Sequence, residues 1–165
     1  KAKADDNPRQ DFIDGINSII FDHQRAQSKQ VLTIGELEKY YRNTFFPIIN
    51  LMLIVFESRF RAKDIPELSY CQGRVFSIRD LEEDWQRGVI NVPGDVISSA
   101  GLSPLSSFEE VGENPKVIDW FRQSLFATKP DLLEAQLLLR LSGEKQTQVV
   151  GNSLISPMLK FIEVH

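Results

Sequence analysis

One apolar run constrains the fold more than any other stretch of the sequence. Residues 45–56 read FFPIINLMLIVF, and Asn50 is the only strongly polar side chain among them. The run is shorter than the roughly 18 to 20 apolar residues that span a bilayer, so we expect protein to cover it and no membrane insertion. Proline suits the first turn of a helix, and charged residues follow the run. We therefore predict a buried central helix from about Pro47 to Ala62.

Composition is typical of a single globular domain. A chain of 165 residues with 42% hydrophobic residues can build one substantial core. The net charge of −4 argues against a protein that wraps nucleic acid by bulk charge. The single cysteine, Cys71, can form neither an internal disulfide nor a structural zinc site alone, which indicates a reducing, cytoplasmic location. We expect residues 1–6 to be a flexible leader and residues 7–165 one helical domain, consistent with a fragment of a larger protein.

Two helix starts near the N-terminus carry clear capping signals. Asn7-Pro8 predicts a helix to about Ala26, with one apolar stripe made by Phe12, Ile16, Ile19, Ile20 and His23. Thr33 and Glu36 form a capping box, so a second helix should begin near Ile34. It should end before Pro47, because the residue preceding a proline disfavours helical torsions.

The middle of the chain gives weaker signals. Residues 68–76 alternate loosely in polarity around Gly73, which predicts a small β-hairpin. Ser77 as cap, with Asp80 three residues later, predicts a helix that runs to Arg87. Gly88 should end that helix in the left-handed conformation. Residues 91–114 are rich in Gly, Ser and Pro, and we expect only brief helical turns there.

Three further helix starts are predicted in the C-terminal third. Asn114-Pro115 opens one helix, residues 128–131 open another that ends at Gly143, and Ser156-Pro157 opens the last. The predicted fold class is therefore all-α: a single-domain bundle of about six to seven helices around the buried central helix.

Groups with catalytic chemistry are scarce in the sequence. Asp22 and His23 point about 100° apart on a helix, so they cannot form a joint ligand set. The acidic runs 82–84 and 109–110 lack the spacing of a calcium loop and indicate solvated helix faces. There is also no glycine-rich phosphate loop. We therefore predict a non-enzymatic protein without catalytic residues, metal or cofactor.

The abundance of apolar helix surface favours a protein–protein interaction or scaffolding module, such as a subunit of an assembly or a self-associating chain. Two helices apolar nearly all round need covering, and a chain of this size offers few other helices to cover them. Aromatic and arginine side chains dominate interfaces, so the predicted partner-binding residues are Tyr40, Tyr41, Arg42, Phe60 and Arg61.

Nucleic-acid binding is the alternative function. Cations and aromatic residues mix in the central third, as they do where proteins grip phosphates and stack on bases. The candidate cations are Lys39, Arg42, Arg59, Arg61, Lys63, Arg74 and Arg79. Acidic residues such as Glu38 and Glu57 interleave with them, which ranks this hypothesis second.

A short stretch carries a family resemblance. Residues 95–103 (DVISSAGLS), followed by residues 114–117 (NPKV), resemble the helix-turn-helix headpiece of lactose-repressor-type regulators. The resemblance implies a DNA-recognition helix. The match departs at Ile97, where the headpiece has alanine, and at Glu109-Glu110, which would face the phosphates. We therefore base no prediction on it.

Overall fold

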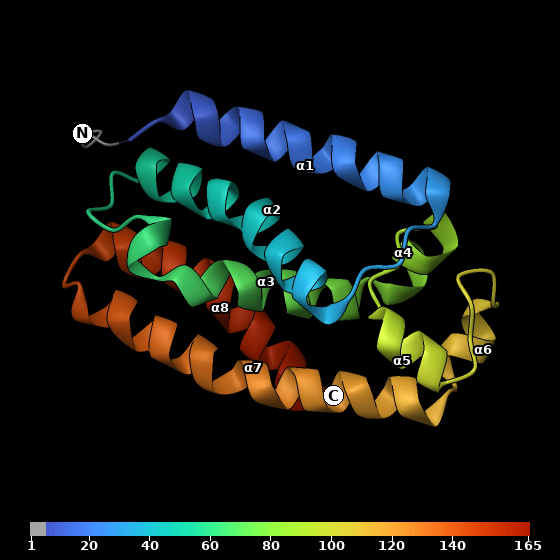
Figure 1. Ribbon diagram of the computed structural model, residues 1–165. Coiled ribbons are helices and arrows are strands. Elements are labelled where there is room, and N and C mark those ends of the chain that lie inside the picture. Colours follow the sequence, from blue (N-terminus) through green and yellow to red (C-terminus); the bar gives the residue numbers. More distant parts are fainter. Residues whose placement is uncertain (1–5) are drawn as a thin grey trace.

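The computed structural model describes residues 6–165 of the chain, and the regular secondary structure of this part is entirely helical (Figure 1). No strand occurs in it, which confirms the all-α prediction, and a bundle of about six to seven helices is close to the arrangement found. The elements in chain order are α1 (Pro8–Ser28), α2 (Ile34–Val55), the 3₁₀-helix η1 (Ala62–Asp64), α3 (Pro66–Arg79), α4 (Leu81–Arg87), α5 (Gly94–Ser99), α6 (Phe108–Gly112), α7 (Pro115–Leu141) and α8 (Lys145–Val164).

The long helices form the body of the bundle, and the three short helices gather at one end (Figure 1). Helix α2 packs between α1 and α3, α3 also contacts α7, and α7 packs on α8. Helices α4, α5 and α6 follow the C-terminal end of α3 and lie beside the start of α7. Within the part of the chain described here, no helix has the length and apolar character needed to cross a membrane.

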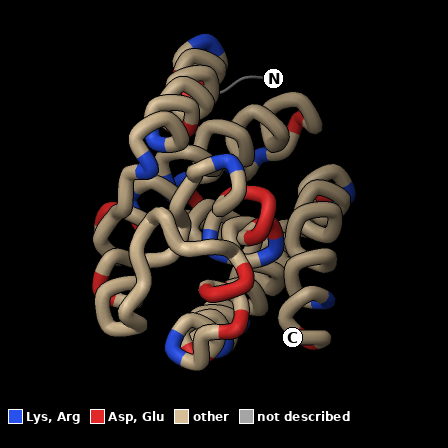
Figure 2. Tube along the Cα trace, turned by 90° about the vertical axis from the view of Figure 1, so that its right-hand side faces the viewer, with Lys and Arg blue, Asp and Glu red and all other residues tan. Residues whose placement is uncertain are grey.

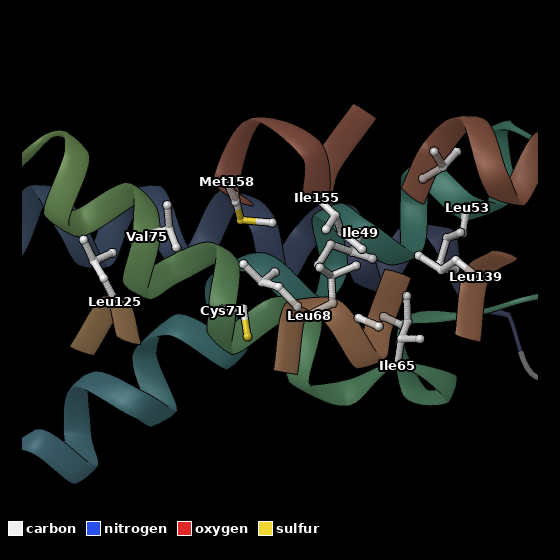
Figure 3. Packing of buried hydrophobic residues seen from close by; sticks show 14 residues of the cluster. Ile49, Leu53, Ile65, Leu68, Cys71, Val75, Leu125, Leu139, Ile155 and Met158 are labelled. Carbon is white, nitrogen blue, oxygen red and sulfur yellow. The ribbon is translucent and has the colours of Figure 1, made fainter. Parts of the chain in front are cut away.

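The main core lies where α2, α3, α7 and α8 meet (Figure 3). Ile49 of α2 lies beside Leu68 of α3 and Ile155 of α8, whereas Leu53 of α2 lies beside Leu139 of α7, and all these side chains are almost completely buried. The predicted burial of the apolar run is therefore confirmed at these positions. A second, smaller core surrounds Trp85 at the end formed by the short helices.

Three predicted helix boundaries at prolines are wrong. Pro47, Pro130 and Pro157 lie inside α2, α7 and α8, so segments predicted as separate helices are continuous. A proline in a helix removes one hydrogen bond and crowds the preceding turn, and here the packing of both halves outweighs that cost. The predicted central helix from Pro47 to Ala62 is thus the second half of α2, and helical structure stops at Val55.

The predicted hairpin at residues 68–76 is also wrong, because these residues lie within α3. Gly73 makes no turn. A Cβ at this position would overlap the Cβ, Cγ and Cδ1 atoms of Tyr41, so glycine lets α3 approach α2 closely. Ser77 is buried within α3 and caps no helix, since the next helix begins only after Asp80.

Most of the predicted helix caps are present in the structure. The side chain of Asn7 accepts a hydrogen bond from the Gln10 backbone, and the capping box of Thr33 and Glu36 is present. The Asn114 side chain caps α7. Gly88 adopts φ +87° after α4, the left-handed conformation that glycine tolerates best.

The apolar stripe predicted on the first helix lies on α1 but is not covered. Phe12 is 62% exposed and Ile19 is 66% exposed, although the helix begins and ends nearly where predicted. Residues 1–5 of the predicted leader lie outside the described residues. Asp6, its last residue, is anchored by the buried side chain of Arg61. In the stretch that resembles a helix-turn-helix, the structure has only the short helices α5 and α6 before α7.

Candidate active site

A groove between α3 and α8 combines apolar walls with positive charge. Its volume is about 330 Å³, and its lining residues are Val75, Phe76, Arg79, Pro157, Met158, Lys160, Phe161, Val164 and His165. Phe76 is supported from behind by Phe45 of α2, with an edge-to-face ring contact at 5.7 Å. Arg79 and Lys160 are the cations of the groove, and both are exposed. The groove therefore suits a ligand with an apolar body and an anionic group.

Two aspartates lie directly after Arg79. Asp80 links the end of α3 to the start of α4, and Asp84 follows one helical turn later. Because Asp80 caps both the C-terminus of α3 and the N-terminus of α4, the two helix dipoles act on its carboxylate in opposite directions. Residues four apart share one helix face, so the two carboxylates lie on the same side of α4. The sequence predicts Asp80 as the residue three positions after a Ser77 cap, and Asp84 as part of a solvated helix face.

Asp84 is in an unusual environment for a carboxylate. Burial raises the pKa of Asp84 to about 6, and the negative charges of Asp80 and Asp22 act in the same direction. The Asn91 amide donates a hydrogen bond to Asp84 at 2.8 Å, which partly offsets the effect of burial. A nearby cation would stabilise this group in its charged form.

The donor set fits one way of binding magnesium. Mg²⁺ is often bound through one or two carboxylates, with the remaining positions filled by water and substrate phosphates. Asp80 and Asp84 fit that pattern. No group of three or more potential metal ligands occurs in residues 6–165, so water or phosphate oxygens would supply most of the coordination of a cation here.

A buried arginine on α1 fixes the position of this acidic segment. The Arg25 side chain has no solvent exposure, and its Nη2 donates to the Ile90 carbonyl at 2.6 Å and to Asn91 Oδ1 at 3.1 Å. It also pairs with Asp22 at 3.7 Å and lies 4.6 Å from the centre of the Tyr40 ring. Because Asn91 in turn holds Asp84, α1 controls where the carboxylate lies.

The predicted partner-binding residues do not form one surface. Tyr40, Tyr41 and Arg42 lie in the first half of α2, where Tyr41 is buried and packs on Gly73. Phe60 and Arg61 come after the other end of that helix, where the chain folds back and the Ala62 backbone N–H donates to the Asn50 side chain at 3.1 Å. Arg61 is itself buried, bound to Asp6 and to backbone carbonyls.

The arginines proposed for nucleic-acid binding are engaged with acidic side chains. Arg42 pairs with Glu67 at 2.8 Å, Arg59 with Glu144 at 2.8 Å, and Arg79 with Asp80 at 2.7 Å. Arg61 pairs with Asp6, and Arg74 lies 3.9 Å from Glu38. Lys39 and Lys63 are exposed. Basic and acidic positions are interleaved along the chain trace (Figure 2), unlike the concentrated positive surface that grips a phosphate backbone.

Comparison with known proteins decides the family. The family model described as squalene/phytoene synthase matches residues 2–151 of the 165 residues. The chain belongs to the squalene/phytoene synthase family. Searches of curated proteins and of solved structures found no match.

Membership of the squalene/phytoene synthase family overturns the functional predictions. The predicted scaffolding or assembly module, the alternative of nucleic-acid binding and the prediction of a non-enzyme are all wrong, because the family consists of synthases. The error came from treating the scarcity of histidine and cysteine as a scarcity of catalytic groups. Arginine and aspartate side chains can also supply such chemistry, and Arg79, Asp80 and Asp84 at the end of α3 are the candidates.

Proposed function

We propose that this chain is an enzyme domain of isoprenoid synthesis, and that the groove between α3 and α8 binds the diphosphate ester of an isoprenoid chain. The observation that carries the proposal is that the groove has apolar walls and two cations, Arg79 and Lys160, and that Arg79 pairs with Asp80, one of two aspartates four residues apart beside the groove. Squalene and phytoene, which name the family, are isoprenoid hydrocarbons. The diphosphate ester is the usual activated form of such a carbon chain.

The groove and the two aspartates that follow Arg79 in the sequence each have a role in this proposal. Phe76, Met158 and Phe161 form a surface for the hydrocarbon chain and keep water away from it. Arg79 and Lys160 attract the diphosphate and offset its charge as it leaves. Asp80 and Asp84 would hold a divalent cation, which supplies further charge neutralisation at the phosphates.

Binding of farnesyl diphosphate in the presence of Mg²⁺, measured by isothermal titration calorimetry, tests this proposal. Lys160→Ala should weaken binding by about tenfold, because a charge-assisted contact with phosphate is lost. Lys145→Ala is the matched control, since Lys145 is exposed on the same helix but lies about 22 Å away along its axis. Farnesol, which lacks the diphosphate, should bind equally to all three proteins. Equal affinity of the wild type and Lys160→Ala for farnesyl diphosphate would contradict the proposal.

We also propose that the chain contacts a partner and that it functions in a reducing compartment. The exposed apolar face of α1, which includes Phe12 and Ile19, supports contact with a protein partner or a second copy of the chain. Sedimentation velocity of the wild type and of Ile19→Ser tests this, and identical monomeric behaviour would argue against self-association. The single buried Cys71 supports a reducing, cytoplasmic location.

A further inference from the structure

Arg79 is paired with Asp80, one of the two aspartates that the proposed cation would need. Its Nε and Nη2 atoms donate to the two oxygens of Asp80, each at 2.7 Å. This is the two-pronged geometry in which a guanidinium matches a carboxylate best. The same guanidinium lies 4.2 Å from the centre of the Phe76 ring, on the wall of the groove. A single side chain therefore contacts both the acidic segment and the ligand groove.

A metal ion and Arg79 would compete for Asp80 in this arrangement. Both carboxylate oxygens already accept hydrogen bonds from Arg79, and its positive charge would repel a divalent cation placed against them. Arg79 can move, because its side chain is 48% exposed and long. A diphosphate in the groove would offer the guanidinium a second anion of higher charge.

We propose that Arg79 is a positioning residue that competes with the divalent cation for Asp80 and is drawn to the diphosphate when substrate binds. This inference rests on the function proposed above. In the ligand-free chain, Arg79 keeps Asp80 paired and lowers its affinity for metal. Substrate binding transfers Arg79 from Asp80 to a phosphate oxygen, which frees the carboxylate for the cation. Metal and substrate then bind cooperatively, because each removes an obstacle to the other.

Arg87 provides a matched control within the same segment. It is an exposed arginine that pairs with Glu83 on α4 at 2.5 Å, so its removal changes the local net charge as removal of Arg79 does. It does not contact either of the two aspartates proposed for the cation. Any effect common to both arginines would reflect bulk charge.

Titration of the ligand-free chain with Mn²⁺, followed by electron paramagnetic resonance of the free ion, measures the competition directly. Arg79→Ala should bind Mn²⁺ about two- to fivefold more tightly than the wild type, the range expected when an exposed ion pair is removed. Arg79→Lys should fall between the two, since lysine keeps the charge but loses the two-pronged contact. Arg87→Ala should match the wild type. Adding Asp80→Asn to Arg79→Ala should abolish the gain.

Several results would overturn the inference. Unchanged or weaker Mn²⁺ binding by Arg79→Ala would do so, as would an equal gain in Arg87→Ala or no detectable binding by any variant. Circular dichroism establishes that each variant is folded. The outcome is separable from the proposed function. Tighter Mn²⁺ binding by Arg79→Ala without farnesyl diphosphate binding by the wild type would remove the proposed function and leave the competition intact. If Lys160→Ala weakens farnesyl diphosphate binding but Arg79→Ala leaves the Mn²⁺ affinity unchanged, the proposed function stands and the competition is wrong.

Discussion

Helices α1 and α2 are neighbours of almost equal length, yet they are held in place by different forces. In α2, six side chains are buried, and most of them are apolar or aromatic. In α1, the buried side chain is Arg25, while Phe12, Ile16 and Ile19 are exposed. Both helices have apolar residues at helical spacing. The comparison teaches that this spacing predicts a helix and its apolar face, but does not predict what covers that face.

Polar contacts hold α1 where apolar packing does not. Near its N-terminus, Asp11 accepts a hydrogen bond from Asn50 of α2 at 2.7 Å, and Asp6 binds Arg61 just before the helix. Near its C-terminus, Arg25 binds Ile90 and Asn91. Directional bonds at both ends can fix a helix whose apolar face contributes little, because each buried donor or acceptor is costly to leave unpaired.

Truncating a core side chain of α2 should have the largest effect on stability. Leu53→Ala should lower the free energy of unfolding by about 2 to 5 kcal/mol, because Leu53 is completely buried and its truncation leaves a cavity. Ile19→Ala on α1 should cost less than about 0.5 kcal/mol, since that side chain is already in water. Urea unfolding followed by circular dichroism measures both. Similar losses in the two variants would mean that α1 is covered as α2 is.

Removing the buried arginine should break the polar attachment of α1. Arg25→Met keeps much of the side-chain volume but leaves the Ile90 carbonyl, Asn91 and Asp22 without their cation. We expect a loss of about 2 to 4 kcal/mol. Arg9→Met, at an exposed position on the same helix, is the control and should have little effect. Hydrogen exchange should show α1 opening before α2, and uniform loss of protection would argue against a separate attachment.

Replacing one glycine in the α2–α3 contact and one in α1 by alanine should change the free energy of unfolding in opposite directions. Gly73→Ala should destabilise by about 1 to 3 kcal/mol, because the new Cβ would overlap Tyr41 and push α3 from α2. Gly15→Ala should stabilise by about 0.5 to 1 kcal/mol, since nothing lies near that position and alanine is the better helix former. Thermal unfolding distinguishes the two changes. Destabilisation by Gly15→Ala would indicate that α1 is more closely packed than the structure shows.

The local parts of the fold could be predicted from the sequence, and the long-range parts could not. The cap at Asn7 and the capping box at Thr33 and Glu36 depend on residues three apart, and both are present. The boundary predicted at Pro47 failed, because the continuity of α2 depends on packing against helices far along the chain. The expectation that a helix ends before a proline considers only local energies, and here the tertiary contacts outweigh the local cost of the proline.

The candidate site was missed for the same reason. The sequence identifies Arg79 as a cation and Asp80 as the partner of a Ser77 cap, but the pairing of Arg79 with Asp80 across a helix junction has no distinctive local signature. Lys160 and Phe161 reach the groove from a helix about eighty positions later in the chain, so no spacing rule could connect them with Phe76. The motif of an arginine followed by two aspartates four apart was the one available signal.

The smallest expected effect concerns Cys71, which lies in the main core against which α2 packs. Its side chain is completely buried in α3, and burial raises the pKa of the thiol to about 12. Because only the thiolate reacts, both effects oppose modification at pH 8. Labelling by a thiol reagent should be at least about a thousandfold slower in the native protein than in urea, as expected for a group exposed only by global unfolding. Ile19→Ala, which alters only the exposed face of α1, should leave the labelling rate unchanged. Rapid stoichiometric labelling of the native protein would show that α3 opens locally. The proposed difference between a tightly packed α2–α3 core and an α1 held by polar contacts would then be wrong.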